Sequence, residues 1–241
     1  RKYSKAIIER LKELKLTKAT VDVTGLDESE RTPFPQGIYA LLREGLPEAR
    51  FQDASGMLEE IREVKSAEEI SLMERAVQIG ESAVETMAEM LRPGILENDV
   101  VGSMLNTMVS RGSELPIMLL WDAGRPVRAL RMALTQRRTL KSGDVICTEF
   151  SPRFRGYCPQ FNQPGVVGYM PKLYERLYRA AMESYRNGWK ALKPGMTVAE
   201  LAQAFHEPVA SAGFRWTSPY FHGIGLGNEG PRGNWPVEKN V

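Results

Sequence analysis

Histidine occurs only twice in this sequence, and its two copies lie in different surroundings. His206 is in LAQAFHEP, where Pro208 and Gly213 end a helical pattern, so we expect it to be exposed or to interact with the helix end. His222 lies between an aromatic, strand-like run and the glycine-rich HGIGLG, where backbone can approach a ligand closely. Because imidazole titrates near neutral pH, His222 is the stronger candidate for proton transfer in a pocket.

The second candidate is Glu149, an acidic residue at the end of the otherwise apolar strand pattern in LKSGDVICTEF. A carboxylate on such a strand is costly to bury unless it is paired, bound to a metal or used in chemistry. The following YCPQFNQPGVVG predicts a second strand, and therefore a hairpin. If the turn centres on residues 154 and 155, Glu149 faces Gln160, and Cys147 and Cys158 lie too far apart to bridge.

Two amides accompany Glu149 in this predicted hairpin. Gln160 and Asn162 are expected on the same face, where neutral amide groups suit an uncharged polar or zwitterionic ligand. A structural alternative for Glu149 is an ion pair with Arg153 or Arg155 of the turn.

The helices and strands that contain these residues are predicted to form an internal repeat. When the chain is compared with itself at an offset of about 101 residues, LRPGILEND (91–99) falls on LKPGMTVAE (192–200). At the same offset, residues 72–75 fall on 173–176, and Gly112 falls on Gly213. The Leu-basic-Pro-Gly pattern suits any helix end and could match by chance. However, three separate matches share one offset. We therefore predict two similar α/β halves, each with a long helix, a break, a shorter helix and a strand.

Shorter patterns precede the repeat. The first sixty residues or so combine a helical start, the strand-like ATVDV and the helical GIYALLREGL, which indicates a small α/β piece. A long helix is expected over about 66–91, begun by a capping box of Ser66 and Glu69. The apolar face of this helix is predicted to contain Ile70, Met73, Val77, Val84, Met87 and Leu91.

Composition excludes several classes of function. In 241 residues, 32 Lys and Arg oppose 30 Asp and Glu without a long run of one sign, so nothing indicates nucleic-acid binding. No apolar run approaches the length of about 20 residues that crosses a bilayer, and the basic start resembles an amphipathic helix, so we expect a cytoplasmic protein. Two isolated cysteines predict neither a zinc cluster nor a disulfide scaffold.

Several of these motifs together resemble the M24 family, which includes aminopeptidase P, prolidase, methionine aminopeptidase and creatinase. They are REVKSAEEISLMERA, LKPGMTVAEL, LKSGDVICTEF followed by Tyr157, and HGIGLGNEGPR. The resemblance runs from about residue 46 to the end. It implies an α/β pita-bread fold of two pseudo-symmetric halves around a curved antiparallel sheet. It further implies that 1–62 is part of a small N-terminal domain and that 63–241 is the catalytic-like domain without its C-terminal end.

The resemblance also implies a metal pair, but this sequence departs from the family pattern at the ligands. Glu149 stands at the first Asp position, and Gln160 replaces the second, bridging Asp. A neutral amide is a poor bridge between two cations. The expected catalytic His is absent near Arg131. The usual His-Glu or His-Asp pair does not follow the glycine-rich run, where Asn228-Glu229 stands one residue early. His222 matches the family His, and the two later Glu ligands would lie beyond residue 241.

We therefore expect a hydrolase that cleaves a C–N bond of a small molecule or short peptide without an ordinary dinuclear metal centre. His222 and Glu149 are the predicted catalytic residues. No cofactor is expected, although Glu149 and His222 could hold one divalent ion of Mn, Fe, Co or Zn. The alternatives are a metal-dependent Xaa-Pro peptidase with an atypical site and an inactive binding module, and the resemblance implies a homodimer. The predicted substrate-binding residues are Gln160, Asn162, Arg131, Tyr157 and Glu229.

Overall fold

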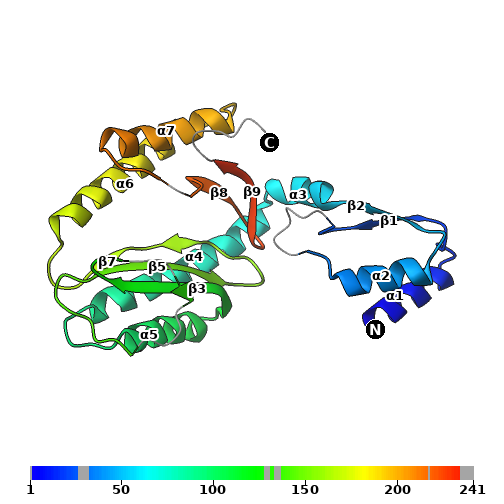
Figure 1. The fold of residues 1–241 in the computed structure, drawn as a ribbon, viewed down its shortest axis with the longest axis horizontal. Helices are drawn as coiled ribbons and strands as arrows, with labels where there is room; N and C mark the ends of the chain where they lie inside the picture. Colours follow the sequence, from blue (N-terminus) through cyan, green and yellow to red (C-terminus); the bar gives the residue numbers. More distant parts are fainter. Residues whose placement is uncertain (1, 27–32, 128–130, 133–136, 217, 234–241) are drawn as a thin grey trace. The chain divides into compact units, whose positions relative to one another are not determined.

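The computed structural model describes residues 2–26, 33–127, 131–132, 137–216 and 218–233 (Figure 1). Contacts between Cα atoms divide the chain into two compact units, Arg1–Val64 and Lys65–Val241. The boundary expected from sequence lay after residue 62.

The first unit is a small α/β structure. Two short strands, β1 (Thr20–Val23) and β2 (Arg50–Asp53), pair in parallel, with Thr20 opposite Arg50. Parallel strands need a crossover connection, which contains helix α2 (Gln36–Gly45). Helix α1 (Lys2–Glu13) packs against α2 so closely that a Cβ on Gly45 would lie 2.4 Å from Cδ1 of Ile8. Helix α3 (Ser55–Glu63) ends the unit.

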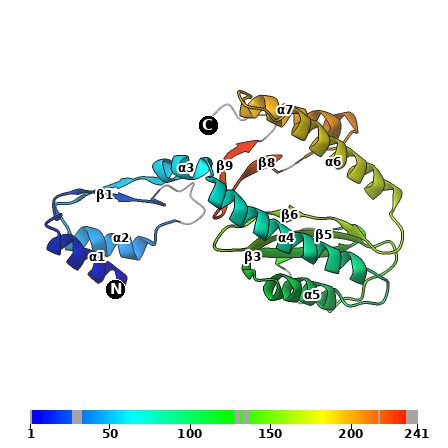
Figure 2. The same ribbon diagram turned by 180° about the vertical axis from the view of Figure 1, so that it is seen from behind.

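The second unit begins with two helices that cover one face of an antiparallel sheet (Figure 2). The helices are α4 (Ala67–Met90) and α5 (Glu97–Ser110). The strand order is β4-β3-β5-β6, and β7 also pairs with β5. The strands are β3 (Glu114–Gly124), β4 (Arg131–Met132), β5 (Val145–Arg153), β6 (Phe161–Asn162) and β7 (Gly165–Val166).

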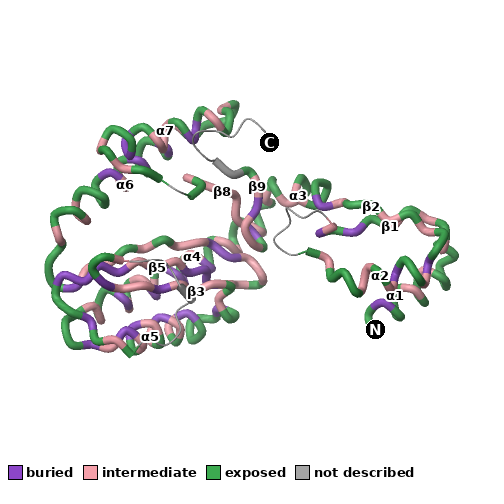
Figure 3. The backbone as a smooth tube through the Cα atoms, in the orientation of Figure 1, coloured by how far each residue is buried: buried purple, intermediate pink, exposed green. Residues whose placement is uncertain are grey.

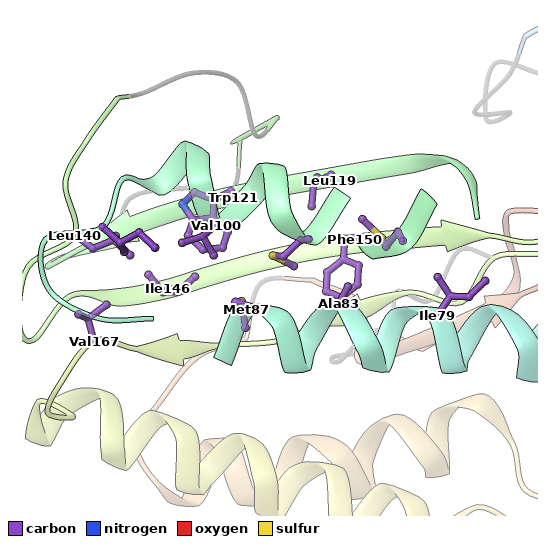
Figure 4. Close-up of a cluster of buried hydrophobic side chains, with 13 residues drawn as sticks. Ile79, Ala83, Met87, Val100, Leu119, Trp121, Leu140, Ile146, Phe150 and Val167 are labelled. Carbon is purple, nitrogen blue, oxygen red and sulfur yellow. The ribbon is translucent and has the colours of Figure 1, made fainter. Parts of the chain in front are cut away.

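The main hydrophobic core lies between these helices and the sheet (Figure 4). Strand side chains alternate between the two faces of a sheet, so Ile146 and Phe150 of β5 point into the core while Cys147 and Glu149 lie on the opposite face. Phe150 stacks on Phe161 of β6 with ring centroids 5.0 Å apart. The core therefore fixes the strand that presents Glu149.

Helix α4 begins as predicted, but its buried face differs from the expected one. The capping box is confirmed, since Ser66 Oγ accepts a hydrogen bond from the Glu69 amide while the Glu69 carboxylate accepts one from the Ser66 amide. Ile70 is 48% exposed, so its place on the apolar face was wrong. Small residues allow the helix to lie close to its neighbours, and the buried side of α4 consists of Ala76, Ile79, Gly80, Ala83 and Met87.

The second half repeats the first, which confirms the two similar halves predicted from the repeat. Helix α6 (Lys172–Ala191) corresponds to α4, and α7 (Val198–Ser211) lies 101 residues after α5 at both ends. A hairpin of β8 (Phe221–Ile224) and β9 (Asn228–Gly233) follows. Figure 3 shows α6 as largely exposed. The buried residues of this helix are Ala180, Ser184 and Gly188. None of the described helices is both long and apolar enough to cross a membrane.

Candidate functional site

Glu149 lies in a hairpin whose register differs from the predicted one. Phe154 bridges to Tyr157, so the turn centres on Arg155 and Gly156, one residue later than expected. Both turn residues have positive φ, 52° and 87°, as a two-residue turn with the twist of a hairpin requires, and glycine makes this conformation accessible. Glu149 is consequently paired with Asn162 rather than with Gln160, which corrects the sequence expectation.

Gln160 nevertheless contacts Glu149 from the neighbouring diagonal position. Its amide Nε2 donates a hydrogen bond to Oε1 of the half-buried Glu149 carboxylate. The other amide atom, Oε1 of Gln160, is buried and has no hydrogen-bond partner among the described residues. Glu149 Oε2 also makes no hydrogen bond within the described part of the chain. The pair thus presents one carboxylate oxygen and one amide oxygen that can accept hydrogen bonds from a ligand.

A second acidic residue shares this face of the sheet and was not singled out from the sequence. Asp122 of β3 is paired with Cys147 of β5, two residues from Glu149. Burial raises the pKa of the Cys147 thiol, and the charges of Asp122 and Glu149 raise it further. Cys147 is therefore a poor nucleophile at neutral pH. Cys147 and Cys158 do not form a disulfide bond with each other.

A buried ion cluster holds the turn from which β5 starts. Arg138 bridges Oε1 of Glu97 at 2.9 Å and Oδ2 of Asp144 at 2.7 Å. Trp121 Nε1 donates to Oε2 of the same Glu97 at 3.2 Å. Burial alone would lower the pKa of Arg138, but the hydrogen bonds to Glu97 and Asp144 outweigh it and raise that pKa. Arg138 remains charged, and the cluster positions β5. Only the Ser-Gly-Asp turn itself was visible as a sequence pattern.

His222 lies in the β8–β9 hairpin, half-buried and paired with Arg232 across the strands. Its Nδ1 lies 2.8 Å from the backbone oxygen of Gly223. Because a carbonyl oxygen only accepts hydrogen bonds, Nδ1 carries the proton, and Nε2 of the neutral ring is left as the basic atom. Gly223 has no space for a side chain, since a Cβ would lie 2.0 Å from the Gly230 carbonyl oxygen.

His206 is half-buried and contacts an aromatic side chain, whereas the sequence predicted exposure or an interaction with the helix end. Its Nδ1 lies 2.8 Å from the hydroxyl of Tyr220, and the two rings meet edge to face. Burial raises the pKa of Tyr220, so this hydroxyl remains protonated. His206 therefore belongs to the aromatic packing between α7 and the start of β8.

The remaining predicted residues are placed as follows. The Tyr157 hydroxyl donates to Glu69 Oε1 at 2.9 Å, a bond that raises the pKa of Tyr157. Glu229 is 2% exposed and forms a 2.6 Å ion pair with Lys65, which favours a positioning role over direct contact with substrate. The backbone of Arg131 pairs with that of Trp121, and its side chain lies outside the described residues.

The two predicted catalytic residues belong to different hairpins that touch each other. Cys158, in the hairpin of Glu149, donates its amide to the carbonyl of Gly225, in the hairpin of His222, at 2.8 Å. No hydrogen bond or ion pair joins His222 to Glu149 within the described residues. The contact between Cys158 and Gly225 therefore connects the hairpin of Glu149 to the hairpin of His222.

The residues present do not fit a dinuclear metal centre. Gln160 directs its N–H group at Glu149, whereas two cations would need a shared anionic oxygen at this position. Within the described ranges, no three His, Cys, Asp or Glu side chains come together in a way that could hold a metal ion.

Comparisons with solved structures show the same fold. X-Pro aminopeptidase from Thermotoga maritima MSB8 matches with a TM-score of 0.79 and 21% identity, over 97% of this chain and 65% of that one. Prolidase from Pyrococcus furiosus matches with a TM-score of 0.77 and 23% identity, over 92% and 65%. The α/β pita-bread fold predicted from the sequence is confirmed.

Sequence comparisons agree with the structural ones. The chain is 25% identical to Uncharacterized peptidase YqhT of Bacillus subtilis (strain 168) over 90% of its own length and 62% of the relative. It is 26% identical to Xaa-Pro dipeptidase of Pyrococcus furiosus, covering 73% of itself and 51% of that protein. The profile of metallopeptidase family M24 matches residues 71–237. The predicted resemblance is thus confirmed, and the chain belongs to metallopeptidase family M24.

Proposed function

We propose that this protein hydrolyses a C–N bond in a short peptide or small amide, and that it does so without a dinuclear metal centre. The observation that carries the proposal is the hydrogen bond from the Gln160 amide to Glu149, at the place where a metal pair would need a shared anion. The M24 fold and the retained His222 support a hydrolytic site. A cytoplasmic location and a homodimer are part of the same proposal.

A separate role is proposed for each group. His222 Nε2 takes a proton from the attacking water, because Nδ1 is occupied by its bond to the Gly223 carbonyl. As the C–N bond breaks, His222 gives this proton to the leaving nitrogen, and the Glu149 carboxylate passes the second proton of the water to the same nitrogen through Oε2. The buried Oε1 of Gln160 and the side chain of Asn162 accept or donate hydrogen bonds to the substrate amide.

The test is hydrolysis by purified, chelator-treated protein of a panel of Xaa-Pro dipeptides, short peptides and small amides. His222→Ala should lower kcat by about 10²–10⁴-fold, the usual contribution of a general base. His206→Gln is the matched control, since His206 binds Tyr220 in the aromatic packing, and it should leave kcat within about twofold. Hydrolysis that survives His222→Ala would remove His222 from the mechanism.

A second candidate is a metal-dependent Xaa-Pro peptidase with a single-ion site. It is favoured by the similarity of this chain to an Xaa-Pro dipeptidase and to an X-Pro aminopeptidase. In this case Glu149 and His222 would hold one ion of Mn, Fe, Co or Zn. Metal analysis distinguishes the two candidates, since near-zero metal in an active preparation excludes the second. Binding of peptides without any turnover would instead indicate a binding module.

A further inference from the structure

Four side chains at the start of α4 and in the two hairpins form a connected set of contacts. The Glu149 hairpin is defined here as residues 145–166, and the His222 hairpin as residues 221–233. Lys65 and Glu69 flank the N-cap Ser66 of α4. Lys65 reaches the His222 hairpin through Glu229, and Glu69 reaches the Glu149 hairpin through Tyr157.

The contact to the His222 hairpin is a buried ion pair. Lys65 Nζ lies 2.6 Å from Glu229 Oε2, and the two side chains are 15% and 2% exposed. The other carboxylate oxygen of Glu229 accepts the Leu226 amide at 3.0 Å. Glu229 lies so close to the turn that a Cβ on Gly225 would lie 2.5 Å from Glu229 Oε1. Lys65 and Glu229 together therefore fix the turn between β8 and β9.

The contact to the Glu149 hairpin uses the capping box. One oxygen of Glu69 accepts the Ser66 amide at 2.8 Å, and the other accepts the Tyr157 hydroxyl at 2.9 Å. The bond to the Ser66 backbone and the bond to Tyr157 both lower the pKa of Glu69, so it stays ionised at neutral pH. Glu69, which is part of the helix cap, therefore holds the tip of this hairpin through Tyr157.

The two anchored tips meet directly. The Cys158 amide donates to the Gly225 carbonyl at 2.8 Å, next to Tyr157 on one side and near Glu229 on the other. Cys158 is 5% exposed, so this bond is shielded from water. We propose that Lys65 and Glu69 are positioning residues that hold the two hairpins, and with them His222 and Glu149, in one arrangement. This inference rests on the proposed function for the roles of His222 and Glu149.

Amide hydrogen exchange measured by NMR tests the arrangement without any substrate. Tyr157→Phe removes only the hydroxyl and should speed exchange of the Cys158 amide about fivefold. Lys65→Met removes the ion pair that Lys65 makes with the buried Glu229, and it should speed that exchange by about tenfold or more. In both variants the Met104 amide, inside α5, should keep its wild-type rate. Unchanged exchange at Cys158, or an equal increase at Met104, would overturn the proposal.

Controls separate positioning from general stability. Tyr169→Phe removes a different tyrosine hydroxyl, which accepts a hydrogen bond from Arg125 at 2.8 Å. This variant should leave exchange of the Cys158 amide unchanged. Lys65→Arg keeps the charge and should restore slow exchange relative to Lys65→Met. On a hydrolysed substrate, Lys65→Met should lower kcat about tenfold with KM within about twofold. If the wild type hydrolyses nothing, the proposed function fails while the exchange result still decides the positioning role.

Discussion

At the residue scale, Glu149 shows what a sequence can and cannot specify about a site. Its identity as an acidic residue on an apolar strand could be read directly, and so could the amide at Gln160. The strand register could not be read from the sequence, because the turn lies one residue later than expected, with Gly156 at a positive φ of 87°. Asp122 was missed for a related reason, since only strand pairing brings it beside Cys147.

The reactivity of the Cys147 thiol depends on the acidic side chains around it. Its pKa is raised by burial and by the charges of Asp122 and Glu149, so its alkylation at pH 8 should be slow. Asp122→Asn removes one charge, lowers the pKa of Cys147 and should speed alkylation about twofold to threefold, with a smaller gain in Glu149→Gln. Peptide-resolved mass spectrometry with iodoacetamide measures this and separates Cys147 from Cys158.

Asp99→Asn provides the control for this prediction. Asp99 is exposed in the first turn of α5, and its removal should leave the Cys147 rate unchanged. A rate that does not respond to Asp122→Asn would mean that the carboxylate does not act on the thiol.

At the element scale, the helices could be predicted closely, but the surface that α4 buries could not. The capping box of Ser66 and the repeat at about 101 residues are local or periodic signals, and both appear in the structure. The buried face depends on what packs against it. Gly80 and Ala83 are buried because the sheet approaches closely, while Ile70 extends toward solvent.

Gly80 tests this close approach. A Cβ there would lie 2.2 Å from Cε2 of Phe161, so Gly80→Ala should destabilise the protein by about 1–3 kcal/mol, as overpacking does. Gly102, inside α5, has nothing within 4 Å of such a Cβ, and Gly102→Ala should stabilise by about 0.5–1 kcal/mol. Urea unfolding measures both variants. Equal effects of the two substitutions would contradict the packing described for α4.

At the scale of the whole molecule, the two-half architecture followed from the sequence because duplication leaves a regular offset. The contacts that join the halves left no such pattern. Lys65 and Glu229 are 164 residues apart, and Glu69 and Tyr157 are 88 apart, so their pairing emerges only in the folded chain. The family match likewise gives the fold, while the proposed chemistry depends on the substituted residues Glu149 and Gln160.

The most direct test of the central claim is a metal titration of the chelator-treated protein, following hydrolysis and bound metal per chain together. The account predicts turnover that does not depend on added Mn, Fe, Co or Zn, and that is lost in His222→Ala. Gln160→Asp supplies the missing anion and should strengthen metal binding relative to the wild type. Two ions bound per wild-type chain, with activity that rises as they bind, would contradict the account.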